Sequence, residues 1–210
     1  MEQDNEKIEQ RILRAASEVF LERGYTATNM TLIAEKAGIG RPSLYYYYRE
    51  KDKIFNELFG SFVKRVFPSV VEIIKRDEPI ERRLDSFVDN YFSQLQSEPR
   101  IPMLILREAY RDPQFLVNNM FDANVISYIN EIREAFQDEV EKGTIKNVPP
   151  YAIIFTCLGQ IVMPMIAKPL VQTVLTGDSS GSWVVAGSFE ELMDLWKPYV
   201  RQSLRSLLLQ

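Results

Sequence analysis

The sequence contains no histidine. The catalytic triads and dyads of serine and cysteine hydrolases use an imidazole as their base, and many metal sites use it as a ligand. These site types are therefore excluded. Chemistry by carboxylates or lysines stays open, but no pair of acids stands in a recognisable arrangement. We expect a protein that is not an enzyme and that carries neither a metal nor another cofactor.

Cysteine is almost as scarce, because Cys157 is the only one among 210 residues. A single thiol makes no intrachain disulfide, which suits a reducing compartment. The opening segment, MEQDNEKIEQRI, is charged and lacks the apolar stretch of a signal peptide. We therefore expect a cytoplasmic protein. Hydrophobic residues at 46% and charged residues at 26% are ordinary for a globular chain with a sizeable core.

Basic residues are fewer than acidic ones, 25 against 29, so the net charge is −4. Its distribution is uneven, however. Residues 23–53 hold six basic and three acidic side chains, a net charge of +3, which leaves −7 for the rest of the chain. A small basic segment on an acidic body fits a protein whose contact with nucleic acid is confined to one end.

Helical periodicity runs through the whole chain, and no segment has the alternating pattern of a strand. In the first segment Ile8, Ile12, Ala15 and Val19 form an apolar stripe, and Gly24 is expected to end that helix. Pro68 is expected to kink or interrupt the helix that begins at Lys51. One very apolar helix is expected over 150–175, a loop over 176–187 and a last helix over 188–209. The fold class is all-α with about nine helices.

Residues 28–53 have the spacing of a helix-turn-helix. Ala34 stands four residues before Gly38, and Leu44 stands six after it. A small residue at the helix crossing, a glycine at the corner and an apolar anchor on the second helix are what the motif needs. Asn29 is a good N-cap for the first of the two helices. We expect a three-helix DNA-binding domain over residues 1–50 and a larger helical domain for ligand binding and dimerisation over 51–210.

Four consecutive tyrosines, Tyr45 to Tyr48, lie on the second helix between two arginines. Leu44 and Tyr48 are four apart and are expected to face the core. Consecutive residues point about 100° apart, so the other tyrosines cannot all join them. A phenol donates to phosphate and packs on sugar, although a plain solvent-exposed helix is the alternative. The residues expected to contact DNA are Asn29, Thr31, Arg41, Pro42, Ser43, Tyr45, Tyr46, Tyr47 and Lys51.

Arg41 begins the second helix, where side chains enter the major groove. Its guanidinium can bind guanine O6 and N7 together, or a phosphate. Ser43 and Pro42 are candidates for contact with phosphate or a thymine methyl, and Lys51 is interpreted as a phosphate contact. Lys51 also begins the next helix. This helix would connect the DNA-binding domain (the head) to the larger domain (the body) and could transmit movement between them.

The run 152–167 is uncharged and approaches the length of a membrane span. Gln160, Pro164 and the adjoining Lys168 favour a buried helix at a subunit interface instead. Aromatic, methionine and polar residues of the body could line a pocket for a largely apolar ligand, with plain core as the alternative. The candidates for this pocket are Phe62, Phe87, Tyr91, Met103, Arg107, Tyr110, Phe121 and Tyr128.

The first 55 residues or so resemble the TetR family of bacterial transcriptional regulators. The resemblance rests on Ile12-Leu13-Arg14-Ala15-Ala16, Gly24-Tyr25, Ile33-Ala34, Ala37-Gly38-Ile39 and Arg41-Pro42-Ser43-Leu44-Tyr45, with Lys51 and Ile54 beyond. Tyr47 and Tyr48 replace a common histidine and phenylalanine, and Leu32 replaces a frequent acid. The body matches the family only in length, helical content and two closing apolar helices.

The resemblance implies a homodimer joined by its last two helices, with contacts expected at Ile161, Met165, Leu192, Trp196 and Tyr199. Two heads would then read a palindrome in successive major grooves about 34–36 Å apart. A small-molecule effector bound in the body would favour another head spacing and release the DNA. The expected function is a ligand-responsive repressor. The alternative is a helical adaptor that associates with a membrane or a protein and does not bind DNA specifically.

Overall fold

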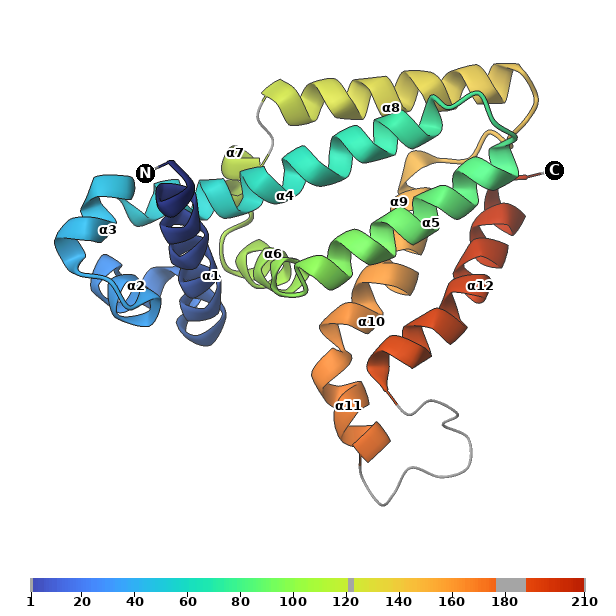
Figure 1. Ribbon diagram of the computed structural model, residues 1–210. Coiled ribbons are helices and arrows are strands. Elements are labelled where there is room, and N and C mark those ends of the chain that lie inside the picture. Colours follow the sequence, from blue (N-terminus) through green and yellow to red (C-terminus); the bar gives the residue numbers. More distant parts are fainter. Residues whose placement is uncertain (1, 121–122, 177–187, 210) are drawn as a thin grey trace. The chain divides into compact units, whose positions relative to one another are not determined.

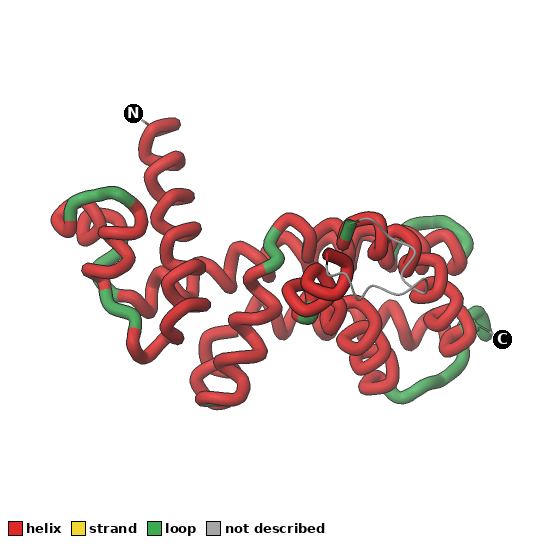
Figure 2. The backbone as a smooth tube through the Cα atoms, turned by 90° about the horizontal axis from the view of Figure 1, so that it is seen from below, coloured by secondary structure: helices red, strands yellow, loops and turns green. Residues whose placement is uncertain are grey.

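The structure is a computed structural model that describes residues 2–120, 123–176 and 188–209. Every regular element in these ranges is a helix, and none of the described residues forms a strand. Figure 2 shows helices making up most of the described backbone. The all-α prediction is confirmed.

The chain divides into two compact units. The first unit is Met1–Arg65 with Arg100–Ile126, and the second is Val66–Pro99 with Ser127–Gln210. The first unit therefore contains two segments of the chain, of which the expected head of residues 1–50 is only a part. A functional boundary near residue 50 stays a prediction.

The first unit contains α1 (Glu2–Ala27), α2 (Met30–Ala37), α3 (Arg41–Tyr47) and the beginning of α4 (Lys51–Ile74), together with α6 (Arg100–Arg111) and α7 (Pro113–Met120) (Figure 1). Its core is a cluster of apolar side chains from α1 to α4 and from α6. The fully buried members include Ile12, Phe20, Ile33, Leu44, Ile54, Phe55, Phe59 and Leu104. These are the periodic positions of the sequence, brought together by the turns.

Glycines stand where the backbone leaves the helical conformation, within α1 and at the end of α2. Gly24 has φ +81°, so the backbone leaves the helical conformation at the expected position, although a further turn follows to Ala27. Gly38 has φ +65° in the left-handed region, and its N–H donates to the carbonyls of Ala34 and Glu35. At the other end of α2, the Asn29 side chain accepts from the N–H of Leu32 at 3.0 Å, so the N-cap prediction is confirmed.

Pro68 does not interrupt its helix. α4 continues without a break from Lys51 to Ile74 with the proline inside. A proline removes one N–H donor and its ring crowds the carbonyl four residues earlier, but here Val63, Val66 and Val70 are buried along the same helix. Burial of this stripe offsets the lost hydrogen bond, which explains why the expected interruption is wrong.

The second unit contains the end of α4, α5 (Ile80–Ser97), most of α8 (Ala123–Glu141), α9 (Pro150–Cys157), the π-helical turn η1 (Leu158–Val162), α10 (Met163–Ile166), α11 (Lys168–Thr176) and α12 (Phe189–Leu208). The single helix expected over 150–175 is thus divided. This division at η1, Pro164 and Pro169 is one reason why the described helices outnumber the nine expected. The expected loop over 176–187 lies outside the described residues except for Thr176, which ends α11.

A buried ion pair ties α5 to α8 within the second unit. Arg83 lies 2.9 Å from Glu139 Oε2, and both side chains are about nine-tenths buried. Burial opposes ionisation of Glu139, but hydrogen bonds from Thr144, Arg83 and Lys142 outweigh it and lower the pKa of the carboxyl to about 2. Glu139 is therefore held as a carboxylate.

In the described part of the chain, no helix combines the length and the apolar character needed to cross a membrane. The uncharged run that raised that possibility is divided among α9, η1 and α10.

Two glycines give a matched test of this architecture. A Cβ on Gly24 would lie 2.8 Å from the Arg107 guanidinium at a φ that side chains rarely adopt, whereas a Cβ on Gly60 in α4 would meet nothing within 4 Å. We expect Gly24→Ala to lower the free energy of unfolding by about 1–3 kcal/mol. Gly60→Ala should raise it by about 0.5–1 kcal/mol, because glycine is a poor helix former. Urea denaturation measures both free energies of unfolding. An unchanged value for Gly24→Ala would contradict the expected strain of a side chain at this positive φ.

Candidate DNA-binding site

The two short helices of the first unit meet at a tight corner. Ala34 is 1% exposed where α2 crosses its neighbours, and Leu44 of α3 is fully buried. The N–H of Ile39 donates to the Ala34 carbonyl at 3.1 Å, which closes the turn after Gly38. The backbone thus has the small residue, the left-handed corner and the apolar anchor of a helix-turn-helix.

The run of tyrosines divides between core and surface. Tyr48 is buried beside Leu44, as the sequence predicts, and its hydroxyl donates to Glu9 Oε1 at 3.0 Å. Burial, together with that bond to a carboxylate, raises the pKa of Tyr48 well above its ordinary value. This phenol therefore stays protonated and holds α1 against the end of α3.

The other side of α3 faces solvent. Arg41, Pro42 and Ser43 are exposed in its first turn. Tyr45 is 42% and Tyr46 78% exposed, while Tyr47 is half-buried with its ring edge-on to Tyr46 at 5.2 Å. A cation, a hydroxyl and two large phenols thus lie accessible on one short helix. Their contact with DNA stays a prediction.

Three more expected contacts have mixed surroundings. Asn29 is exposed but uses its side-chain oxygen as the N-cap of α2, and Thr31 is half-buried in the first turn of that helix. Lys51 is half-buried, and its ammonium donates to the carbonyls of Tyr25 at 2.8 Å and Thr28 at 3.0 Å. A phosphate contact by Lys51 stays a prediction, although the structure uses its ammonium within the protein.

Several contacts that hold this site together have no signal in the sequence. The Arg11 guanidinium donates to the carbonyl of Ala37 at 2.7 Å, at the end of α2. Tyr25 donates to Asp52, and Arg107 donates to the Leu21 carbonyl at the end of α1. These partners are between 26 and 86 residues apart, so no local pattern indicates them.

Arginines of α6 contact residues of α1. Arg100 lies 3.0 Å from Glu18 Oε1, and the Arg111 guanidinium lies 5.2 Å from the Tyr25 ring centroid. Arg111 also pairs with Glu108, which is fully buried, at 2.5 Å. These contacts explain why α6 belongs to the same compact unit as the helix-turn-helix.

The expected ligand-pocket residues fall in both units. Phe62, Met103, Arg107 and Tyr110 belong to the first, whereas Phe87, Tyr91 and Tyr128 belong to the second. Phe121 lies outside the described residues. Tyr110 is 86% exposed and Arg107 binds a backbone carbonyl, but Tyr91 is half-buried, and burial raises its pKa to about 12. A pocket formed by these residues stays a prediction.

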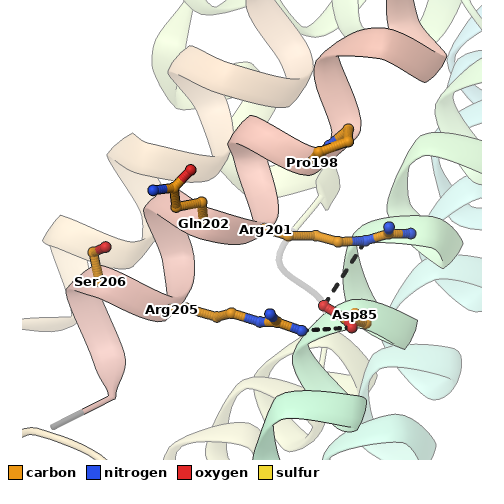
Figure 3. A pocket seen from close by; sticks show the side chains of 6 residues that line it. All are labelled: Asp85, Pro198, Arg201, Gln202, Arg205 and Ser206. Carbon is orange, nitrogen blue, oxygen red and sulfur yellow. Dashed lines mark hydrogen bonds and ion pairs between the residues drawn. The ribbon is translucent and has the colours of Figure 1, made fainter.

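The second unit has a polar hollow of about 430 Å³ between α5 and α12. Figure 3 shows Arg201 and Arg205 extending from α12 toward Asp85 on α5. Arg205 Nη2 lies 2.7 Å from Asp85 Oδ2, and Arg201 Nη2 lies 2.5 Å from Asp89 Oδ1. The remaining lining residues are Pro198, Gln202 and Ser206. None of the expected ligand residues lines this hollow, and its charges are already paired.

Large apolar side chains lie exposed on the closing helices. They are Tyr151, Ile154, Phe155, Leu158, Met163, Leu170, Leu195 and Tyr199, each more than 40% exposed. We call this set the closing-helix face.

Among the expected dimer contacts, only Tyr199 belongs to this face. Ile161 is fully buried and Met165 is 4% exposed within the second unit, Leu192 is half-buried, and Trp196 donates to the Gln160 carbonyl at 2.8 Å. The contacts of these five residues with a second chain stay predictions.

Among the described residues no group of three or more cysteine, aspartate or glutamate side chains is placed to hold a metal ion.

Comparison with known proteins places these features among bacterial regulators. The family model described as "Bacterial regulatory proteins, tetR family" matches residues 12–58, which span the end of α1, the helix-turn-helix and the start of α4. The chain is 23% identical to the HTH-type transcriptional regulator YhgD of Bacillus subtilis over 147 residues. This aligned region is 70% of this chain and 76% of the relative.

It is also 27% identical over 142 residues to the fatty acid metabolism regulator protein of Bacillus subtilis, covering 64% and 69% of the two chains. Among solved structures, a TetR family transcription regulator from Marinobacter aquaeolei is similar over the full length of both chains, with a TM-score of 0.64 at 20% identity.

Proposed function

The chain is a transcriptional regulator that belongs to the TetR family, and we propose that it represses transcription as a homodimer on a palindromic operator. The observation that carries this proposal is the exposed surface of α3, where Arg41, Ser43, Tyr45 and Tyr46 are accessible while Leu44 anchors the helix. A short helix fixed by its core side and polar on its outer side is what a major groove accepts.

In this proposal the parts of α3 have different tasks. The Arg41 guanidinium reads a guanine edge or binds phosphate at the start of the helix. The phenols of Tyr45, Tyr46 and Tyr47 contact phosphate and sugar, which positions the helix without reading sequence. Asn29 and Thr31 at the start of α2 contact the neighbouring phosphate.

Dimerisation is supported by the closing-helix face. Proteins usually cover most of their large apolar side chains, so a group of exposed ones marks a candidate interaction site. A two-fold dimer presents the same face from both copies and buries it in one contact. Phe155, Leu158 and Tyr199 are the proposed centre of that contact, in addition to the residues expected from the sequence.

Release of the operator by a small molecule is the remaining part of the proposal. A largely apolar effector is supported by the aromatic and methionine side chains of the body and by the name of one relative, a fatty acid metabolism regulator. The effector would shift the protein toward a state with lower DNA affinity by binding that state more tightly. The role is regulation in the cytoplasm rather than catalysis.

In vitro selection from random duplexes tests the proposal as a whole. Two copies of one reading helix, related by a two-fold axis, should recover a palindrome whose half-sites are about one helical turn apart. Recovery of a single half-site without symmetry would argue for a monomer on DNA. Failure to enrich any sequence would overturn sequence-specific binding.

Arg41 provides a point test of the reading helix. We expect Arg41→Ala to weaken binding to the selected duplex by about 1–3 kcal/mol and to relax the preference at one base position, because a bidentate contact is lost. Arg133→Ala is a matched control, since that arginine is exposed on α8 in the second unit. Equal affinities for wild type and Arg41→Ala would remove Arg41 from the interface.

Phe155 tests the dimer. Phe155 is 66% exposed, so Phe155→Glu should leave the protomer folded. In a two-fold dimer each copy would contribute one such glutamate to the contact, which would bury two negative charges. We expect the dimer to weaken by roughly 4 kcal/mol, or about a thousandfold in Kd. Sedimentation velocity measures the change. Val117→Glu on α7, at a residue 47% exposed, is the control that should stay dimeric. A dimeric Phe155→Glu would place the contact elsewhere.

A further inference from the structure

The cations of the helix-turn-helix region differ in how their charge is used. Arg11 donates to the end of α2, and Lys36 is paired with Glu18 at 3.3 Å and Glu22 at 3.2 Å. By contrast, Arg49 and Lys53 are exposed, and among the described residues neither the Arg49 guanidinium nor the Lys53 ammonium has a hydrogen-bond or ion-pair partner. Charges of the second kind are the ones available to another molecule.

Lys51 belongs to the first kind. Its Nζ lies 2.8 Å from the Tyr25 carbonyl, 3.0 Å from that of Thr28 and 3.5 Å from that of Thr26. It also lies 4.4 Å from the centroid of the Tyr25 ring. An ammonium has three N–H donors, and these carbonyls occupy them. A phosphate would have to displace bonds that the protein already makes.

Helical rotation separates Lys51 from Lys53. At about 100° per residue, Lys51 lies on the side of α4 that carries the buried Ile54, Phe55 and Leu58. Lys53 lies about 200° away, on the side that faces solvent. Arg49 stands in the turn between α3 and α4, directly after the buried Tyr48. The two free cations thus flank the point where the reading helix ends and α4 begins.

The carbonyls that Lys51 holds belong to the connector between α1 and α2. The same connector is fixed by Thr28, whose hydroxyl donates to the Gly24 carbonyl at 2.7 Å, and by Tyr25, whose hydroxyl donates to Asp52. The connector leads directly into Asn29, the N-cap of α2. Lys51 therefore sets where α2 starts relative to α4.

We propose that Arg49 and Lys53 make the phosphate contacts at the junction of α3 and α4, and that Lys51 is a positioning residue that fixes the α1–α2 connector. This assignment rests on the proposed DNA binding and changes which residues carry it. The ligand is the sugar-phosphate backbone of duplex DNA, recognised by charge and without regard to sequence.

Salt dependence separates the two roles. The logarithm of the binding constant falls linearly with the logarithm of salt concentration, by about 0.9 for each phosphate neutralised. The probes are the duplex recovered by in vitro selection with wild type and a random-sequence duplex of the same length. The variants are Arg49→Gln, Lys53→Gln and Lys51→Met, which keep most of the side-chain volume. Lys64→Gln is the control, because Lys64 lies on the exposed side of α4 three turns beyond Lys53.

We expect Arg49→Gln and Lys53→Gln each to flatten the salt slope by about one unit per DNA-bound head while leaving the melting temperature unchanged. Lys51→Met should lower the melting temperature and the affinity without changing the slope, and Lys51→Arg should restore both, because a guanidinium also donates to carbonyls. Lys64→Gln should alter neither quantity.

An unchanged slope in Arg49→Gln or Lys53→Gln overturns the contact assigned to that residue, and a flattened slope in Lys51→Met overturns its positioning role. If Lys51→Met does not fold, the slope of Lys51→Gln at low temperature and the two other variants still decide the assignment. Wild-type protein that binds neither duplex would instead overturn the proposed DNA binding itself.

Discussion

Packing of Phe20, Tyr25 and Phe55 is the contact on which the first unit depends. Phe20 and Phe55 meet edge-on with centroids 5.5 Å apart, and Tyr25 lies 5.0 Å from Phe55. These rings come from α1, from the segment after Gly24 and from α4, so they fix three parts of the chain at one point. α2 and α3 close over this cluster through Ile33 and Leu44. An exposed reading surface is possible because the core sides of such short helices are held so firmly.

Tyrosine serves opposite purposes at different positions of the first unit. Tyr25 and Tyr48 are buried, their hydroxyls bind carboxylates, and their pKa values are raised by burial and by those acids. Tyr45 and Tyr46 are exposed on α3. On α3 the exposure of Tyr45 and Tyr46 follows from helical rotation, because Leu44 faces the core and the residues next to it point in other directions. Burial of Leu44 would therefore leave these phenols on the surface even if they did not contact DNA.

The sequence predicts the parts of the fold that depend on local pattern. Apolar periodicity placed the helices, Gly38 and Asn29 placed the ends of α2, and the four-residue spacing from Leu44 to Tyr48 separated core from surface. It did not predict continuity of α4 through Pro68, because that depends on burial along the whole helix. The carbonyl contacts of Lys51 and Arg11 were likewise invisible, since their partners are brought near only by folding. Arg41, Ser43, Tyr45 and Tyr46 are exposed on α3, and their contact with DNA stays a prediction. Ile161 and Met165 are buried within the second unit, and their contact with a second chain also stays a prediction.

The π-helical turn η1 has a consequence for how the closing helices tolerate change. Such a turn holds one residue more than an α-helical turn, so it shifts every later side chain around the axis by about 100°. Tyr151 and Phe155 before the turn, Leu158 at its first position and Met163 directly after it are all exposed. Cys157, Ile161 and Met165 are all buried. Removal of a single residue from 158–162 would let the helix become regular, yet it would turn the later apolar side chains out of line with the earlier ones. The length of this segment is therefore a structural constraint in its own right, in addition to the identities of its buried side chains.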